Sequence, residues 1–297
     1  MDKSRYIPDS TLIVNDDGSI YHLKLRPDQL ADTVITVGDP DRVLAVSKHL
    51  DRIEHKVASR EFVTHTGYKD SKRLSIISTG IGTDNIDIVL NELDALVNID
   101  FDSRKEKEKH TQLTLVRIGT SGTVQSDIPL DSTIVTRAAV GYDGLAWWYG
   151  SQFKGMTGAN MIAADTEELP HMSGTARPYL TMAPTNLLRH FCTDDIISGT
   201  TATLPGFYAA QGRHLRAQPA HHNWVQALAQ ARVGRHAITN FEMETAGLYA
   251  MSAILGHRCV SISAILANRA TGKFSTKPAE TVENLIIHGL ERVLALD

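Results

Sequence analysis

The apolar residues of this chain predict β-strands that alternate with α-helices. Short runs rich in β-branched and aliphatic residues, typical of buried strands, occur at residues 33–37, 59–65, 74–78, 113–118, 132–140, 195–202 and 259–265, and residues 21–25 alternate like a short edge strand. Apolar residues three or four positions apart, typical of amphipathic helices, occur at residues 43–50, 84–97, 219–233, 241–255 and 278–296. Because these elements alternate without a repeat or a linker, we expect a single α/β domain over residues 1–297.

Two segments of the chain are too polar for the core of that domain. Residues 1–20 are expected to be flexible, and the charge run at residues 102–110 is expected to be a solvated surface insert. Trp147 and Trp148 fit either the core or the rim of a site.

Composition and charge then narrow the class of protein. A mix of 42% hydrophobic and 22% charged residues is ordinary for a globular protein, and a net charge of -4 argues against a general nucleic-acid-binding surface. No apolar run reaches the roughly 18 residues of a membrane span. Only two cysteines are present, Cys192 and Cys259, which fits a reducing compartment. We therefore expect a cytoplasmic protein with neither a membrane nor a nucleic acid as partner.

The predicted strand at residues 113–118 contains an arginine, Arg117, and is followed at once by Gly119, Thr120, Ser121 and Gly122. A buried guanidinium needs an anionic partner, and a glycine-hydroxyl turn can aim N–H and O–H donors at an anion. The stretch therefore fits a small oxyanion at the end of a strand. It equally fits an ordinary turn with Arg117 paired to a structural carboxylate.

A second candidate anion site lies where the first strand meets a helix. Gly38 ends the strand at residues 33–37, Asp39 can cap the following helix, and Arg42 lies in its first turn. Arg42 and Arg117 could converge with Thr120 on one phosphate, because a guanidinium matches phosphate oxygens in a bidentate way. The alternative is that each arginine pairs with a nearby carboxylate.

Two further groups of residues could bind other parts of a small molecule. Glu242 and Glu244 are expected at a helix start, where a carboxylate complements the helix dipole. Residues two apart do not share a helical face, so at most one of them need have this structural role. The other is available for vicinal hydroxyls, as on a ribose. Phe207, Gln211 and Arg213 offer a stacking face, an amide and a fork of donors for a planar base. That trio also fits an ordinary polar loop.

Other kinds of site are disfavoured. Gly80 and Gly82 begin like a dinucleotide-binding motif, but Asn85 stands where its third glycine belongs. The histidines and cysteines show no metal-ligand spacing, so no metal site is expected. The nucleophile motif of serine hydrolases is also absent from the sequence.

Taken together, the motifs resemble those of the nucleoside phosphorylases of the uridine phosphorylase type. They follow the family's order from residue 21 to the C-terminal part of the chain, at residues 21–25, 37–42, 59–62, 78–82, 117–122, 207–213, 240–245 and 267–269. The resemblance implies one nucleoside phosphorylase domain with a central mixed, twisted and partly barrel-like sheet flanked by helices. It also implies phosphorolysis, in which a pyrimidine nucleoside and phosphate give the free base and ribose 1-phosphate.

The resemblance assigns a role to each matching residue. The phosphate site would comprise Gly38, Arg42, Arg117, Thr120 and, lent by a neighbouring subunit, Arg60. Ribose would contact Met243, Glu244 at its 2′- and 3′-hydroxyls, and the neighbour's His22 at its 5′-hydroxyl. The base would contact Phe207, Gln211 and Arg213, with Arg269 in support. The catalytic contribution would come from Arg117, Glu244, Gln211 and Arg213, with phosphate as co-substrate and no resident cofactor.

The resemblance also bears on partners and alternatives. Shared sites imply a homodimer or homohexamer. Some relatives bind a monovalent cation between subunits; Glu61 and Ile81 match that pattern, whereas Asn85 replaces its serine. Relatives that act on purines place an aspartate where this chain has Asn268, so uridine is the expected substrate. The alternatives are a purine nucleoside phosphorylase, a hydrolytic nucleosidase and a catalytically silent nucleoside-binding protein.

Overall fold

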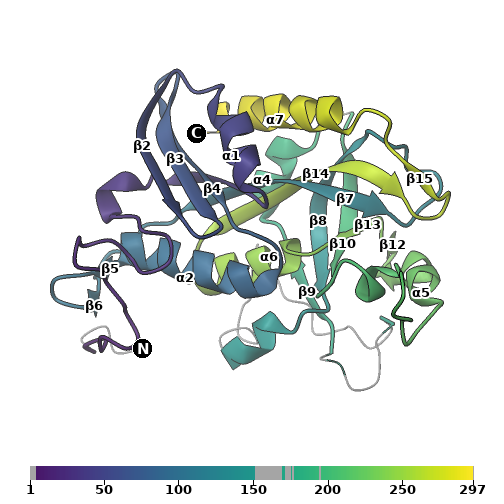
Figure 1. The fold of residues 1–297 in the computed structure, drawn as a ribbon, viewed down its shortest axis with the longest axis horizontal. Coiled ribbons are helices and arrows are strands. Elements are labelled where there is room, and N and C mark those ends of the chain that lie inside the picture. The colour runs from purple at the N-terminus through teal and green to yellow at the C-terminus, as the bar shows by residue number, and fades with distance from the viewer. Residues whose placement is uncertain (1–4, 151–168, 171–174, 176, 194, 297) are drawn as a thin grey trace.

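One large mixed sheet forms the centre of the molecule. The computed structural model describes residues 5–150, 169–170, 175, 177–193 and 195–296 (Figure 1). Within these residues, eleven strands form a sheet in the order β15-β14-β8-β10-β13-β7-β1-β4-β3-β2, with β9 beside β8. Their bounds are β1 Thr33–Val37, β2 Arg52–Ser59, β3 Phe62–Lys69, β4 Lys72–Ser78, β7 Thr114–Thr123, β8 Thr133–Gly141, β9 Tyr179–Met182, β10 Ile197–Thr203, β13 Asn240–Glu242, β14 Arg258–Asn268 and β15 Lys273–Phe274.

Part of this sheet closes on itself. Strand β14 pairs with β7 on one side and with β8 on the other, while β10 joins β8 to β13 and β13 returns to β7. Five strands thus form a closed ring, and β1, β4, β3 and β2 extend it as an open wing. The wing is parallel at β1 and antiparallel beyond β4. The predicted mixed, partly barrel-like sheet is confirmed.

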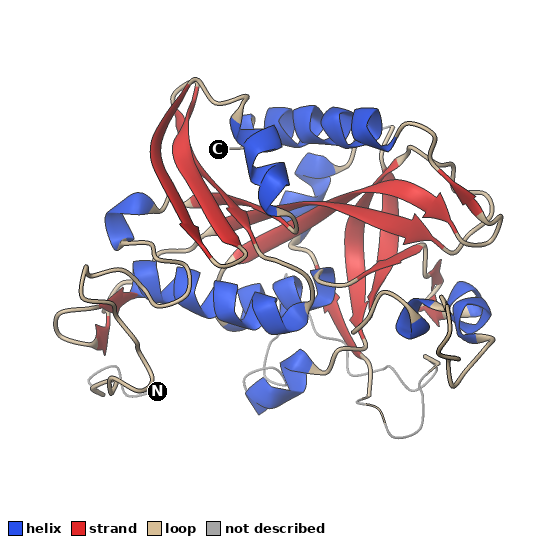
Figure 2. Cartoon of the chain, viewed as in Figure 1, coloured by secondary structure: helices blue, strands red, loops and turns tan. Residues whose placement is uncertain are grey.

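Helices cover both faces of the sheet (Figures 1 and 2). Helices α1, α4 and α7 lie on one side, and α2 and α6 on the other. The helix bounds are α1 Pro40–Ser47, α2 Thr83–Asn98, α4 Thr185–Phe191, α5 Trp224–Gln230, α6 Thr245–Ile254 and α7 Pro278–Leu294, with 3-10 turns η1 Pro27–Gln29, η2 Leu145–Tyr149 and η3 Ala209–Gln211. Two small hairpins complete the described elements: β5 Ile99–Asp100 with β6 Lys105–Glu106, and β11 Arg232–Val233 with β12 His236–Ala237.

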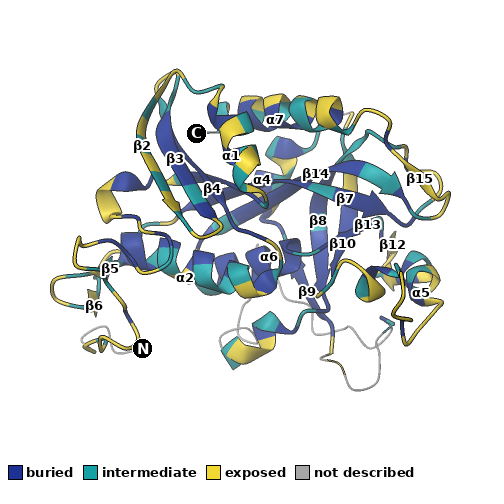
Figure 3. Cartoon of the chain, in the orientation of Figure 1, coloured by how far each residue is buried: buried dark blue, intermediate teal, exposed yellow. Residues whose placement is uncertain are grey.

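The central strands are buried on both faces, which explains their continuous apolar runs (Figure 3). Neighbouring residues alternate between the two helical layers. Val34 and Leu115 pack into the cluster that includes α2 and α6, whereas Ile35 and Val116 pack into the cluster that includes α1 and α7. Because successive side chains of a strand point to opposite faces, the position of each polar residue in β7 determines the face of the sheet on which it lies.

Several predicted elements were wrong in detail. Residues 21–23 form a turn and residues 24–25 have no regular structure, so the predicted edge strand is absent there. The predicted strand at 59–65 instead joins β2 to β3 through a tight turn, in which Arg60 takes a left-handed backbone with φ of 56°. The helix predicted over 219–233 is confined to α5, and the one predicted over 241–255 divides into strand β13 and helix α6.

The predicted turn at residues 119–122 was also wrong. Strand β7 runs on through Thr123, because β14 pairs with it along its whole length and β13 pairs with its end. The glycines there serve close packing instead of a turn.

The N-terminal segment and the charged insert contact each other. Arg104 of the insert donates from Nε to the backbone oxygen of Ile7 at 2.9 Å, and from Nη2 to that of Leu12. Leu12 and Ile20 are buried. The predicted flexibility of residues 1–20 stays a prediction, and residues 1–4 lie outside the described part.

None of the helices in the described ranges is long and apolar enough to cross a bilayer.

Candidate active site

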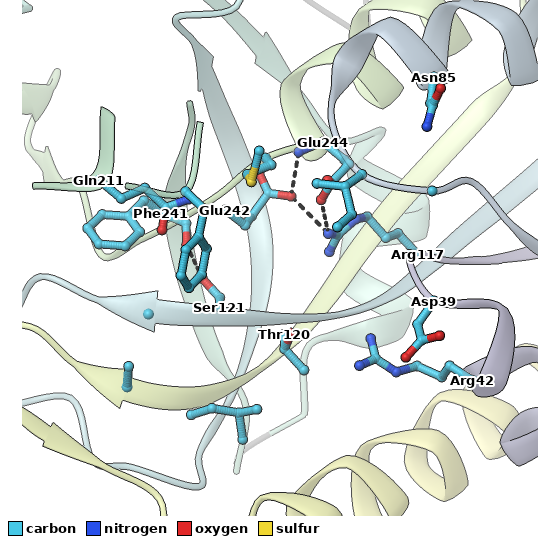
Figure 4. Close-up of a pocket in the computed structure, with 18 of the residues that line it drawn as sticks. Asp39, Arg42, Asn85, Arg117, Thr120, Ser121, Gln211, Phe241, Glu242 and Glu244 are labelled. Carbon is cyan, nitrogen blue, oxygen red and sulfur yellow. Dashed lines mark hydrogen bonds and ion pairs between the residues drawn. The ribbon is translucent and has the colours of Figure 1, made fainter. Parts of the chain in front are cut away.

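A cavity of about 780 Å³ opens beside the ends of β1, β4, β7 and β13 (Figure 4). Most of the residues predicted for the site line it: Gly38, Arg42, Arg117, Thr120, Phe207, Gln211, Arg213, Met243 and Glu244. Three predicted residues, His22, Arg60 and Arg269, are not among its lining. Segments as distant in sequence as residues 38 and 244 thus meet in one cavity, as expected where strands of an α/β sheet end.

One end of the cavity gathers positive charge. Gly38 follows β1, and Asp39 caps helix α1 by accepting a hydrogen bond from the backbone N–H of Asp41 at 2.9 Å. Arg42 lies in the first turn of α1, and no hydrogen bond or ion pair engages its guanidinium in the described part of the chain. Burial, and then the nearby Arg117, lower the pKa of Arg42. Two close cations at a helix N-terminus make this end of the cavity suited to an anion.

Arg117 divides its donors between carboxylates and the cavity. Its side chain is buried, and its Nη2 lies 2.5 Å from Glu244 Oε2 and 3.1 Å from Glu242 Oε2. Its Nη1 is buried and has no hydrogen-bond partner. Although burial opposes the charge, Glu242 and Glu244 raise the pKa of Arg117. Arg117 lines the cavity while Nη2 binds two structural carboxylates, and Nη1 has no hydrogen-bond partner among the described residues.

Glu244 stands at the start of helix α6. It precedes the first residue of α6, and its Oε1 accepts a hydrogen bond from the backbone N–H of Gly82 at 2.7 Å. Burial raises the pKa of Glu244, and Arg117 opposes that shift. Glu244 thus ties the turn before α2 to α6 and brings a carboxylate to the middle of the cavity, between the cationic end and Gln211 (Figure 4).

The other end of the cavity is aromatic and rich in amide and guanidinium donors. Arg213 donates from Nη1 to Gln211 Oε1 at 2.5 Å, and its guanidinium lies 3.8 Å from the centre of the Phe207 ring. Burial, and then the neighbouring Arg269, lower the pKa of Arg213 to about 10. With its oxygen engaged, Gln211 has its NH₂ group free to donate to a ligand.

Arg269 supports this end from behind. It donates to the backbone oxygens of Gln211 at 3.0 Å and of Gly212 at 3.4 Å, so it fixes the turn that carries Gln211. Asn268, beside it, points away from the cavity: its amide donates to the backbone oxygens of Gln125 and Ile128. The position where purine-specific relatives were expected to carry an acid is therefore used to hold a loop.

His22 and Arg60 both lie outside the cavity. His22 is fixed by Glu92, which accepts from its Nδ1 at 2.6 Å and from the backbone N–H groups of His22 and Leu23 at 3.0 and 2.9 Å. Arg60 is exposed at the β2–β3 turn, with its guanidinium 5.8 Å from the centre of the Tyr21 ring. The two segments lie side by side, but neither side chain completes the cavity of its own chain.

Sequence reasoning missed part of the lining. Phe241 lines the cavity and was not predicted, and Ser121 and Glu242 line it without a role assigned by the resemblance; Glu242 was expected with Glu244 at a helix start, yet it ends strand β13. The local sequence carries no signal for that role, because the partners of Glu242 come from β7, β10 and α6. Among the described residues, no group of three or more His, Cys, Asp or Glu side chains is arranged to hold a metal ion.

Comparison with known proteins identifies the family of this chain. A family model described as the phosphorylase superfamily matches residues 32–296. The uridine phosphorylase of Thermococcus kodakarensis is 29% identical over 283 residues, covering 94% of this chain and 88% of the relative. That of Escherichia coli is 26% identical, covering 93% and 95%. A solved Trypanosoma brucei nucleoside phosphorylase, described as showing uridine phosphorylase activity, matches with a TM-score of 0.85 and 27% identity, covering 96% of this chain and all of that one. The chain belongs to the phosphorylase superfamily.

Proposed function

We propose that this protein is a uridine phosphorylase, a pentosyltransferase that converts uridine and phosphate to uracil and ribose 1-phosphate. The observation that carries the proposal is the pair of arginines at one end of the cavity. Among the described residues, the Arg42 guanidinium has no hydrogen bond or ion pair, and the buried Nη1 of Arg117 has no hydrogen-bond partner. Buried donors are rarely left unsatisfied, so an oxyanion is the natural ligand there. The names of the similar proteins point to the same reaction.

The arrangement suits the charge changes of phosphorolysis. Breaking the glycosidic bond builds positive charge on the sugar and negative charge on the departing base. Phosphate held by Arg42, Arg117, Thr120 and the Gly38 backbone would supply the nucleophile and stabilise the sugar cation. Glu244 and Met243 would hold the ribose, with the Glu244 carboxylate accepting from its hydroxyls. Since positioning and preorganised charge carry the rate, no covalent enzyme nucleophile is needed.

The base end of the cavity favours a pyrimidine. Uracil presents carbonyl oxygens, and the free NH₂ of Gln211 and the guanidinium of Arg213 are donors for them. Phe207 would lie against the ring, and Arg269 would support the turn. A purine would need an acid to protonate its ring, yet the side chain at Asn268 is turned away and engaged. We therefore propose that uridine is cleaved much faster than inosine or adenosine.

We further propose that the working enzyme is a homodimer or homohexamer in the cytoplasm. His22 and Arg60 lie close together on the surface, outside their own cavity, where they could reach the ribose and phosphate of a neighbouring subunit. Cys192 and Cys259 are both free thiols, as a reducing compartment favours. Sedimentation of the purified protein tests the assembly, and a monomer with full activity would contradict it.

The direct test of the reaction is uracil release from uridine, followed by ultraviolet absorbance with and without phosphate. We expect cleavage only when phosphate is present. Cleavage in its absence would identify a hydrolytic nucleosidase, the second candidate with this fold. Faster cleavage of inosine would identify a purine enzyme, and binding of uridine without any cleavage would identify a silent nucleoside-binding protein.

A further inference from the structure

Glu242 is the most heavily hydrogen-bonded carboxylate of the cavity. Its Oε1 accepts from the Thr203 hydroxyl at 2.6 Å, and its Oε2 accepts from the backbone N–H of Glu244 at 3.0 Å. Thr245 donates to it from both its backbone N–H, at 2.9 Å, and its hydroxyl, at 2.9 Å. Arg117 Nη2 completes the set at 3.1 Å. Five donors thus converge on one buried carboxylate.

This environment leaves little room for a substrate hydroxyl. A carboxylate offers about four acceptor positions, and here neighbouring groups of the protein fill them. Figure 4 shows the Glu242 carboxylate directed at the Arg117 guanidinium and at the start of α6. Glu244 differs, because its contacts in the described structure are only the Gly82 N–H and Arg117.

We propose that Glu242 is a positioning residue that acts through Arg117 and Glu244 without contacting the substrate. By holding Nη2, it fixes the guanidinium of Arg117, which lines the cavity. By accepting from the N–H groups of Glu244 and Thr245, it fixes the first turn of α6 and therefore the Glu244 carboxylate. The inference deepens the proposed function and rests on it, since the groups it orients are those assigned to phosphate and ribose.

Thr203 provides a way to disturb Glu242 without touching the cavity. It is fully buried at the end of β10, does not line the cavity, donates to Glu242, and accepts from the backbone N–H of Ala246 at 2.9 Å. Thr203→Val removes this hydroxyl, and Thr203→Ser keeps it. Thr64→Val is a matched control, because Thr64 is equally buried but its hydroxyl has no hydrogen-bond partner.

The experiment measures steady-state kinetics and the binding of inorganic phosphate by calorimetry. We expect Thr203→Val to lower kcat/KM for phosphate roughly tenfold and to weaken phosphate binding by a similar factor, as for the loss of one hydrogen bond to a charged group. Thr203→Ser and Thr64→Val should stay near wild type in both. Glu242→Gln should lower kcat/KM for phosphate roughly a hundredfold, because the NH₂ group of glutamine would face the surrounding donors. Glu242→Asp should recover part of that loss.

Substrate discrimination separates positioning from direct contact. If Glu242 positions both the Arg117 guanidinium and the Glu244 carboxylate, Thr203→Val and Glu242→Gln should weaken phosphate binding and lower the ratio of uridine to 2′-deoxyuridine kcat/KM together. A collapse of that ratio with phosphate binding intact would overturn the inference, as would a Thr203→Val enzyme whose thermal stability falls while both kinetic and binding constants stay unchanged. If the wild type binds phosphate but does not cleave uridine, the proposed function fails and the calorimetric comparison still decides the role of Glu242. If the wild type binds no phosphate, both the proposed function and the proposed role of Glu242 fail.

Discussion

Replacing Gly119 with alanine should displace the Arg117 guanidinium. An added Cβ would lie 1.7 Å from Nη1 and 2.6 Å from Cζ of Arg117. Normal contact between such atoms is about 3.5 Å, so the guanidinium would have to move by roughly 2 Å. The end of a flexible side chain usually moves at little cost. Here it is buried and bound to Glu242 and Glu244, so the movement breaks at least one charge-assisted hydrogen bond, which costs about 1.5–3 kcal/mol.

A double-mutant cycle isolates this effect. Urea unfolding gives the stabilities of wild type, Gly119→Ala, Arg117→Ala and the double variant. Alanine at position 119 should cost about 2 kcal/mol in the wild type and less than about 0.5 kcal/mol when residue 117 is alanine, since the space is then vacant. In the wild-type background, kcat/KM for phosphate should fall at least tenfold. Additive free energies would refute the reasoning, because they would show that the new methyl group does not act through Arg117.

Three further predictions address pH, the base end and the subunit contact. Burial already raises the pKa of Glu244, and Arg117→Met removes the cation that opposes this shift. A raised folded-state pKa stabilises a protein at low pH and ceases to do so as pH rises through that pKa. The stability deficit of this variant should therefore be smallest at low pH and grow as the pH rises above the ordinary glutamate range, to roughly 3–5 kcal/mol, and urea unfolding showing a constant deficit would contradict it. Asn268→Asp should lose roughly 1–3 kcal/mol of stability, because a carboxylate oxygen would face two backbone carbonyl oxygens. The variant should not cleave inosine, and measurable inosine turnover would show that residue 268 reaches the base. Glu92→Gln should loosen His22 and reduce kcat/KM roughly tenfold for uridine but little for 5′-deoxyuridine, and an equal loss on both substrates would argue against a 5′-hydroxyl contact.

The elements that sequence predicted well are those whose signal is local. The apolar face of α2 and the β-branched run of β1 carry their own periodicity, and Asp39 with Pro40 marks the start of α1. The predictions that failed depend on contacts distant in sequence. A glycine pair after an apolar run usually means a turn, but β7 continues through Gly119 and Gly122 because β14 and β13 pair with it. Gly119 is needed for the close approach of Arg117.

In the candidate site too, some features were predicted from the local sequence and others depend on contacts between distant residues. The expectation that Arg117 needs an anionic partner follows from the cost of burying a guanidinium, and it is confirmed. Which carboxylates would meet it could not be read from the chain, because Glu242 and Glu244 lie more than a hundred residues away. The assumption that residues 241–255 form one helix also hid Glu242. Only the break between β13 and α6 turns its carboxylate back onto the helix start and onto Arg117.

The buried charges explain why a phosphate site would contain two carboxylates. Arg42 and Arg117 are balanced in number by Glu242 and Glu244 of the same lining, so these four side chains together carry no net charge. The hydrogen bonding is uneven, because both carboxylates contact Nη2 of Arg117. Its Nη1 has no partner among the described residues. A buried unsatisfied donor costs about 1–3 kcal/mol of stability. An oxyanion bound by Nη1 would remove that cost, so the unsatisfied donor would add to the affinity of the proposed site for phosphate. Carboxylates that paired with both nitrogens would give a more stable fold and a weaker phosphate site.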